Sequence, residues 1–268
     1  MNQQWQWQTE HNYSYLTCDL LSSWQHGFFT AEFYPQTPAE LNGILKPDAN
    51  AYRVKQVHGD VVLTPQEIST IVNQDKEHNS VAKADAVVSD RPNQSVWVAS
   101  ADCTPILIGD VVTGQVAAIH AGWRGTALKI APQAIARFLK FGSKLEDLRV
   151  ALGPAISGTV YQVEEPVALA VGRSIIADAK TDVAILAELQ SLPQSPLMLD
   201  EEPGKLRLNV ALVSLIQLRQ LGISSINIAI APYCTYRYEN PAASDQYPFF
   251  SYRRTGEKKV QWSGIVSH

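Results

Sequence analysis

Short apolar runs, most of them no longer than a single strand, alternate along the chain with turn-forming residues. Residues 95–100 (SVWVAS), 104–110 (TPILIGD) and 114–122 (GQVAAIHAG) are rich in β-branched and other apolar side chains, so they predict three strands joined by short turns. Further runs of this kind predict strands at 23–30, 148–153, 226–232 and 249–254.

Longer stretches show the 3.6-residue period of helices. In residues 126–142, Leu128, Ala131, Ile135 and Phe138 recur at helical spacing, and a glycine ends the stretch. Pro132 falls near the first turn, where a missing N–H is tolerated. Residues 166–179 and 209–222 predict two more amphipathic helices.

The predicted strands and helices mix without strict βαβ alternation. This order favours an α+β protein in which helices cover a mixed β-sheet, in a three-layer αβα arrangement. No internal repeat and no linker-like segment divides the 268 residues, so we expect a single domain over 1–268.

Composition narrows the function classes. The net charge is −4 and no run of Lys or Arg occurs, so nothing predicts nucleic-acid binding. No apolar stretch is long enough to span a membrane, and the first residues do not form a secretory signal. The 3 cysteines are odd in number and far apart, which argues against a disulfide framework. We therefore expect a cytoplasmic protein.

Three side chains of metal-binding type stand at loop–strand junctions: His58 in KQVHGD, Cys103 in SADCTP and His120 in IHAGWRG. Two imidazoles and one thiolate form a ligand set that zinc accepts, with a fourth position left open as in catalytic sites. The alternative is a hydrogen-bonded core histidine with inert buried cysteines. Asp85 and Asp90, in ADAVVSD, are turn residues or carboxylates that support metal ligands.

The segment HAGWRGT predicts an anion site. Gly122 and Gly125 permit close backbone approach, a helix begins nearby, and Arg124 adds a positive charge in the same turn. The alternative is a glycine turn in which Arg124 pairs with a surface carboxylate. In FFSYRRTG, Arg253 and Arg254 would lie on opposite faces of a strand, so at most one of them would point into a cleft.

Seven motifs taken together resemble the laccase-domain family, also called multicopper polyphenol oxidases. They occur in the family's order over nearly the whole chain: KQVHGD, ADAVVSD, SADCTPILIGD, IHAGWRGT, GPAISGTVYQV, YCTY and FFSYRRTG. The resemblance implies a three-layer αβα domain and a metal, zinc or else copper, held by His58, Cys103 and His120. It also implies phosphorolysis of purine nucleosides (adenosine, inosine and methylthioadenosine) and adenosine deamination, so the expected partners are a purine nucleoside and phosphate.

The sequence departs from the family's pattern at three places. Ala31 stands where the family usually has an arginine, and Gln162 stands where it commonly has a glutamate. The tail EKKVQWSG lacks the Gly-Arg that usually follows the paired arginines. These departures bear on substrate contacts and leave the metal triad intact.

Three other functions use the same residues. A copper-dependent polyphenol oxidase needs many imidazole ligands, and the chain has only 6 histidines, without a His-x-His pair. A hydrolase or deamidase would use Cys103 as nucleophile and His120 as base, as in a bacterial toxin deamidase domain that the fold also resembles. A binding protein would keep the triad as a structural site. We expect the nucleoside enzyme, with Arg124 and one of Arg253 and Arg254 facing the phosphate.

Overall fold

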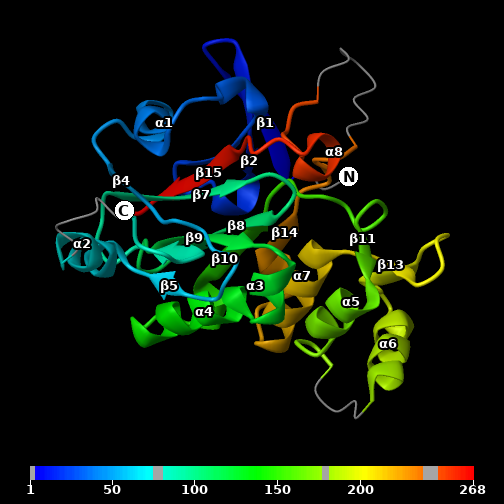
Figure 1. Ribbon diagram of the computed structural model, residues 1–268. Helices are drawn as coiled ribbons and strands as arrows, with labels where there is room; N and C mark the ends of the chain where they lie inside the picture. The colour runs from blue at the N-terminus through cyan, green and yellow to red at the C-terminus, as the bar shows by residue number, and fades with distance from the viewer. Residues whose placement is uncertain (1–3, 75–80, 177–180, 238–246) are drawn as a thin grey trace.

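Two six-stranded β-sheets lie face to face at the centre of the molecule (Figure 1). This computed structural model describes residues 4–74, 81–176, 181–237 and 247–268. The first sheet has the order β1-β2-β3-β15-β7-β4, in which β4 and β7 pair in parallel and the other neighbours are antiparallel. Its strands are β1 (Trp5–Glu10), β2 (Tyr13–Cys18), β3 (His26–Phe29), β4 (Asn50–Arg53), β7 (Gln94–Ser100) and β15 (Gln261–Val266).

The second sheet has the order β14-β10-β8-β9-β6-β5 and is also mixed. Its strands are β5 (Val62–Leu63), β6 (Ala86–Val88), β8 (Thr104–Asp110), β9 (Val116–Ala121), β10 (Leu148–Leu152) and β14 (Ile228–Ile230). A smaller antiparallel sheet stands apart from these two, in the order β11-β13-β12. It consists of β11 (Gln162–Glu164), β12 (Leu197–Leu199) and β13 (Lys205–Leu208).

Helices cover the outer faces of the sheets. The helix α1 (Pro38–Leu45) packs on the first sheet, and α4 (Ile130–Lys140) and α7 (Val210–Gln220) pack on the second. The small sheet packs with α5 (Glu165–Gly172) and α6 (Asp182–Ser191). The remaining helices are α2 (Pro65–Gln74), α3 (Trp123–Ala127) and α8 (Tyr252–Thr255), with 3-10 turns η1 (Asp19–Leu21), η2 (Ala31–Phe33), η3 (Leu145–Asp147) and η4 (Ser225–Asn227).

The strand β8 shows why the second sheet is buried on both faces. Its alternate residues Ile106 and Ile108 pack toward α4 and α7, whereas Leu107 packs against the first sheet. All three side chains are 0% exposed. Because successive side chains of a strand point to opposite faces, a strand covered on both sides must be apolar throughout. This explains why the run TPILIGD does not alternate with polar residues.

The α+β class, the mixed pairing and the predicted strands at 95–100, 104–110, 148–153 and 226–232 are confirmed, with small differences at their ends. The expected αβα arrangement around one sheet differs from what is observed, because the described strands form three sheets and two of them pack together. The N-terminal hairpin β1–β2 and the last strand β15 complete the first sheet, and the apolar pattern predicted neither.

The long helix expected over 126–142 is divided into α3 and α4. Lys129 separates them in a left-handed conformation, with φ at 63°. A proline in a helix clashes with the carbonyl four residues earlier, which for Pro132 is that of Leu128. One continuous helix therefore cannot run through this point, and Pro132 instead occupies the first turn of α4.

Two other predicted elements need correction, one helix and one strand. The helix expected over 166–179 is α5, which ends at Gly172, and residues 177–179 lie outside the described residues. The strand expected over 249–254 is wrong, because Tyr252–Thr255 form the short helix α8. The Ser251 side chain caps α8 by accepting the Arg254 N–H at 3.2 Å, and Gly256 ends it at a φ of 70°.

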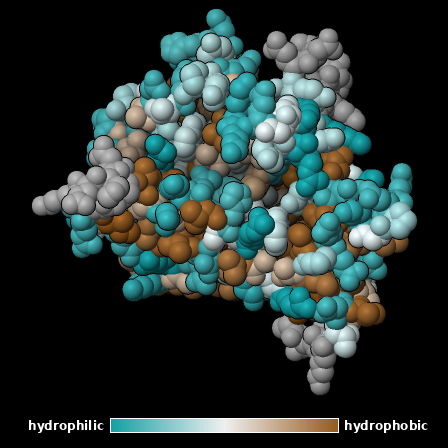
Figure 2. Space-filling view, viewed as in Figure 1, coloured by the Kyte–Doolittle hydropathy of each residue, from teal (hydrophilic) through white to brown (hydrophobic). Residues whose placement is uncertain are grey.

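Hydrophobic residues reach the surface in small groups among hydrophilic ones on the face shown in Figure 2. Among the helices that the structure describes, none combines the length and the apolar character needed to cross a membrane.

Close packing of an indole over a glycine predicts the result of one substitution in the first sheet. Gly264 of β15 is paired with Trp97 of β7, and a Cβ at Gly264 would lie 2.4 Å from the buried indole. We expect Gly264→Ala to lower the free energy of unfolding by about 1–3 kcal/mol, because the ring has no room to move. Urea denaturation measures this change. The matched control is Gly43→Ala in α1, where nothing lies within 4 Å and alanine should preserve or raise stability. Equal effects at both positions would contradict the packing argument.

Candidate metal centre

The centre lies where β9 ends, between the beginnings of its two neighbouring strands. In the register of β8 and β9, Thr104 is paired with Ala121, so Cys103 precedes β8 beside the end of β9. On the other side, the His120 N–H donates to the backbone carbonyl of Asp85 at 2.8 Å, just before β6. Antiparallel pairing on both sides of β9 thus brings a thiol, an imidazole and a carboxylate to one edge of the second sheet.

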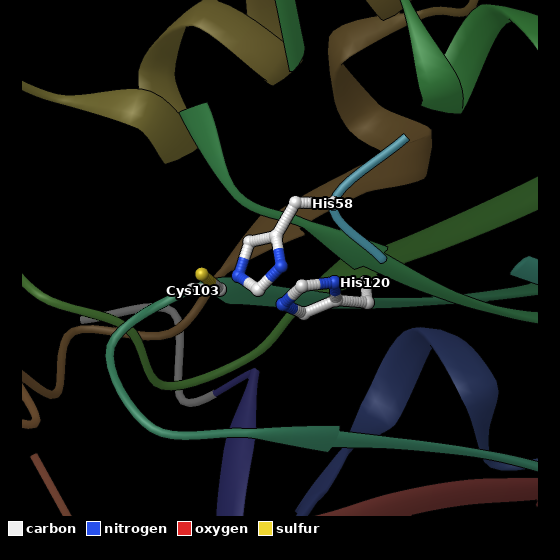
Figure 3. A group of neighbouring side chains, drawn as sticks. All are labelled: His58, Cys103 and His120. Atoms are coloured by element: carbon white, nitrogen blue, oxygen red, sulfur yellow. The ribbon is translucent and has the colours of Figure 1, made fainter. Parts of the chain in front are cut away.

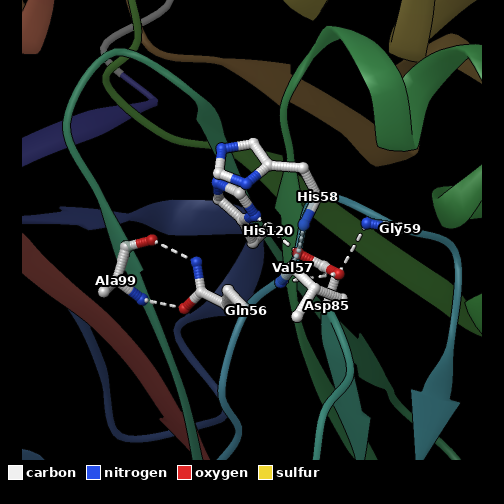
Figure 4. Close-up of polar contacts among 7 residues, drawn as sticks. All are labelled: Gln56, Val57, His58, Gly59, Asp85, Ala99 and His120. Atoms are coloured by element: carbon white, nitrogen blue, oxygen red, sulfur yellow. Dashed lines mark hydrogen bonds and ion pairs between the residues drawn. The ribbon is translucent and has the colours of Figure 1, made fainter.

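The Asp85 carboxylate holds the loop that carries His58. It accepts N–H groups from Val57 at 3.2 Å, from His58 at 2.8 Å and from Gly59 at 2.7 Å (Figure 4). The same carboxylate accepts from Nδ1 of His120 at 3.0 Å. Burial raises the pKa of Asp85, but the bonds from His120 and from the loop outweigh this and leave it below its ordinary value. Asp85 is 0% exposed and stays ionised.

A second contact fixes the start of the same loop. The Gln56 side chain donates to the carbonyl of Ala99 at 2.7 Å and accepts the Ala99 N–H at 2.7 Å (Figure 4). The loop is therefore attached to β7 of the first sheet and to Asp85, just before β6 of the second sheet. Within this loop, His58 has a left-handed backbone conformation, with φ at 60°.

His58, Cys103 and His120 are brought together as predicted (Figure 3). Their ligand atoms all lie within 4.8 Å of one another, and the two imidazole rings meet edge to face at 4.8 Å between centroids. Zinc lies about 2.0 Å from nitrogen and about 2.3 Å from sulfur in proteins, so one ion can contact all three after a small contraction. With Nδ1 of His120 held by Asp85, Nε2 is left for an ion, the usual arrangement for a histidine ligand.

The side chains alone already favour a thiolate. Burial raises the pKa of the Cys103 thiol, but hydrogen bonds from His120 and His58 outweigh it and bring the pKa to about 6. Burial lowers the pKa of His120, but its contacts with Asp85 and Cys103 raise it to about 9. A deprotonated sulfur is both a metal ligand and a nucleophile, so this pair suits either role.

Gly122 and Gly125 make room for the centre, as the sequence predicts. A Cβ at Gly122 would lie 2.9 Å from Sγ of Cys103 and 3.2 Å from the His58 ring. A Cβ at Gly125 would lie 2.9 Å from the carbonyl oxygen of Gly59. The glycines of this turn therefore let α3 begin directly against the triad and the His58 loop.

Asp102, adjacent to Cys103, connects the centre to α8. Its carboxylate accepts the Thr235 hydroxyl at 2.7 Å and the Arg253 N–H at 2.7 Å. Asp102 has a φ of 88°, so the chain turns sharply just before the thiol. Sequence reasoning did not single out this residue, although its place beside Cys103 in SADCTP is a signal.

The three arginines of the sequence prediction have different surroundings. The guanidinium of Arg253 lies over the Tyr161 ring at 4.8 Å and donates to the Gln162 carbonyl at 2.9 Å. That of Arg254 donates to the carbonyls of Thr235 (2.5 Å), Tyr236 (3.2 Å) and Phe249 (2.9 Å). Arg124 is exposed, with its guanidinium 4.4 Å from the ring centre of Trp123. Arg254 thus holds backbone, whereas Arg124 and Arg253 keep donors for a ligand.

Tyr161 lies among the charges of the site. Burial raises the pKa of its hydroxyl, the Cys103 thiolate and Asp102 raise it further, and Arg253 and Arg124 lower it. Of these groups, the Arg253 guanidinium is in direct contact with the Tyr161 ring, at 4.8 Å. The predicted opposite placement of Arg253 and Arg254 on two faces of a strand does not occur, because both belong to α8.

The other histidines and cysteines in the described residues lie elsewhere. His26 is buried, accepts the Cys18 N–H at 2.8 Å and contacts the Trp24 carbonyl. Burial raises the pKa of Cys18 to about 11, and the sulfur of Cys234 accepts two backbone N–H groups. These cysteines have structural roles, whereas His78 falls outside the described residues.

Both single-residue departures from the expected motifs lie close to the segment containing α8. The Ala31 N–H donates to the Pro248 carbonyl at 2.7 Å, so residue 31 adjoins the chain that leads into α8. The Gln162 carbonyl accepts from the Arg253 guanidinium of α8 at 2.9 Å, and the Gln162 amide donates to Asp200 at 3.2 Å and to Glu202 at 3.1 Å.

Comparisons with known proteins agree with this description. A protein of Synechocystis sp. named purine nucleoside phosphorylase is 52% identical over 98% of this chain and 97% of its own length. A Bacteroides thetaiotaomicron protein of the same name is 31% identical over 69% of this chain and 61% of its own length.

Solved structures show the same fold. The Bacillus licheniformis hypothetical protein YfiH superposes with a TM-score of 0.73, at 22% identity over 98% of this chain and 99% of that one. YlmD from Geobacillus stearothermophilus superposes with a TM-score of 0.75, at 21% identity over 98% of both chains. Residues 39–267 match the family described as multi-copper polyphenol oxidoreductase laccase, and the chain belongs to this family.

Proposed function

We propose that this protein is a purine nucleoside phosphorylase. The observation that carries the proposal is the 52% identity, over nearly the full length of both chains, to a protein of that name. We place the proposed active site at the triad at the end of β9 and the arginines near it.

The proposed substrates are adenosine, inosine and methylthioadenosine. A phosphate oxygen forms a bond to ribose C1′, the bond from C1′ to the purine nitrogen breaks, and its electron pair leaves with the base. The base takes up a proton, so the products are the free purine and ribose 1-phosphate. Adenosine deamination, in which water replaces the amino group at purine C6, is proposed as a second activity of the same site.

We propose that His58, Cys103 and His120 hold zinc, or copper in its place. Two nitrogens and one sulfur suit both metals, and nitrogen and sulfur ligands bind Cu²⁺ more tightly than Zn²⁺. A metal ion there would supply a Lewis acid. The chain itself holds Nε2 of His120 in place through Asp85 and brings the His58 loop to it.

Arg124 and Arg253 are the proposed phosphate contacts. The Arg253 N–H is held by Asp102, next to Cys103, and Arg124 follows two residues after Gly122, which packs against Cys103. A guanidinium offers several N–H donors in a plane that matches phosphate oxygens. Arg254 directs donors to three backbone carbonyls, so we assign the phosphate to Arg124 and Arg253 in preference to it.

The histidines argue against a multicopper oxidase in this chain. Of those that the structure describes, only His58 and His120 belong to the group able to hold a metal. His26 already has partners on both ring nitrogens, and His11 and His268 belong to other parts of the molecule. Two imidazoles cannot supply the several copper ions of such a centre.

A cysteine hydrolase is the second candidate, favoured by one observation. Cys103, His120 and Asp85 form a chain of contacts from thiolate to imidazole to carboxylate. This order of groups activates cysteine nucleophiles in hydrolases. The two candidates differ in whether the sulfur binds metal or substrate.

The first test of the triad is metal content. We expect the purified protein to carry about one equivalent of zinc or copper, since three ligands converge on one point. Alanine at His58, Cys103 or His120 should lower the content sharply, as measured by elemental analysis. Full metal content in the Cys103→Ala protein would exclude the thiolate as a ligand.

The second test concerns Asp85, which positions two of the three ligands. We expect Asp85→Asn to weaken zinc binding by about 10- to 100-fold, because the amide cannot accept every N–H that the carboxylate accepts. Competition with a chromophoric chelator measures the affinity. Asp90→Asn is the matched control, since Asp90 lies at the other end of β6 and accepts from Gln66 and Gln94 instead. Equal losses in both variants would contradict the positioning role of Asp85.

The third test distinguishes the phosphorylase from the cysteine hydrolase. Adenosine and phosphate are incubated with the protein, and adenine is separated from inosine to resolve phosphorolysis from deamination. We expect chelation to abolish turnover and zinc to restore it. Chelation should also expose Cys103 to iodoacetamide, at a rate that rises with pH through a midpoint near the Cys103 pKa of about 6.

The hydrolase candidate predicts the reverse. Turnover would survive chelation, and alkylation without chelator would destroy it, because a free thiolate is then the catalyst. Full nucleoside turnover in demonstrably metal-free protein would contradict the proposed metal-dependent function.

A further inference from the structure

A polar cavity of about 280 Å³ lies between the small sheet, α8 and residues 236–237. Three guanidinium groups line it, from Arg207, Arg237 and Arg253, together with a single carboxylate, that of Asp200. Its volume is just below the range of roughly 300–1,000 Å³ in which pockets enclose whole drug-sized ligands. The cavity therefore suits a small anionic group.

The carboxylate in the cavity is already satisfied by the protein. Asp200 accepts from Nε of Arg207 at 2.7 Å, from the Glu202 N–H at 2.9 Å and from the Gln162 amide at 3.2 Å. The backbone bond from Glu202 and the contact with Arg207 lower its pKa to about 2. Asp200 thus orients Arg207, and the side chains that line the cavity carry three positive charges and one negative charge.

Each guanidinium keeps donors for a ligand. A guanidinium has five N–H groups, and that of Arg207 donates to Asp200 and to the Thr159 carbonyl. Arg253 directs one N–H to the Gln162 carbonyl. The Arg237 side chain has no hydrogen bond or ion pair with the residues that the structure describes.

Arg253 connects this cavity to the metal centre. Its backbone N–H is held by Asp102, next to Cys103, and its side chain lies on Tyr161 and lines the cavity. Arg253 therefore lines the cavity and is also attached to the residue that precedes Cys103 of the triad.

We propose that this cavity binds the phosphate group of a substrate, held by Arg207 and Arg237 together with Arg253, the one phosphate contact proposed above that also lines the cavity. The inference rests on the proposed function only for the identity of the reaction, since the charge and shape of the cavity stand independently. The phosphate group can come from two sources, inorganic phosphate as the co-substrate or the 5′-phosphate of a purine nucleotide. Gln162 suits an anion site because its neutral amide donates to the carboxylates of Asp200 and Glu202. A glutamate at this position would add a third negative charge beside them, which would weaken the binding of a phosphate group.

The test uses Arg237→Gln and Gln162→Glu in the full-length protein, with Arg219→Gln as the control for loss of one positive charge. Arg219 is exposed in the last turn of α7 and belongs to a different cavity. Titration calorimetry at constant ionic strength measures the Kd of inorganic phosphate and of adenosine 5′-monophosphate. Thermal unfolding without ligand confirms that each variant is folded. If Gln162→Glu does not fold, the affinities of Arg237→Gln alone test the proposed phosphate subsite.

We expect Arg237→Gln to raise the Kd of one of the two probes by about tenfold, as the loss of one charge-assisted hydrogen bond implies, and Arg219→Gln to leave it unchanged. A change for inorganic phosphate identifies the co-substrate, and a change for the nucleotide alone identifies the 5′-phosphate. Unchanged affinity for both probes overturns the proposed subsite. If nucleoside turnover is absent while Arg237→Gln still weakens phosphate binding, the proposed function fails and the subsite stands.

Discussion

One buried carboxylate holds the candidate centre together. Asp85 cannot remain ionised in the interior unless its oxygens accept hydrogen bonds, because an unpaired buried charge costs several kcal/mol. The chain meets this requirement with the N–H groups of Val57, His58 and Gly59 and with Nδ1 of His120. Satisfying the carboxylate therefore fixes the His58 loop and the His120 ring at the same time.

A second aspartate, on the other side of β9, also holds distant segments through its carboxylate. Asp102 precedes Cys103 and β8 as Asp85 precedes β6, and its carboxylate holds Thr235 and the backbone of Arg253. Segments that are far apart in sequence are thus attached to the beginnings of two strands that flank β9. The second sheet supplies the rigid edge, and the two carboxylates attach to it the loop that carries His58 and the helix that carries Arg253.

The sequence predicts the parts of this molecule that depend on local pattern. The apolar runs of β7, β8 and β9 have strand length, and metal-binding residue types stand at their ends, so the triad could be named in advance. The helix α8 could not, because its start depends on acceptors at Ser251 and Asp102, the latter more than a hundred residues away. The packing of the two sheets against each other could not be predicted from the sequence either. A strand covered by a helix and a strand covered by a second sheet show the same apolar run.

The conformation of His58 favours a role for its side chain in the centre. A φ of 60° is uncommon for a residue other than glycine and carries a cost in backbone energy. The bonds from residues 57–59 to Asp85 offset that cost, and the result is an imidazole held against Cys103 and His120. A Cys–His–Asp hydrolase needs no second imidazole at this position. The proposed three-ligand metal centre does need one, so the backbone conformation of His58 favours that centre over the cysteine hydrolase.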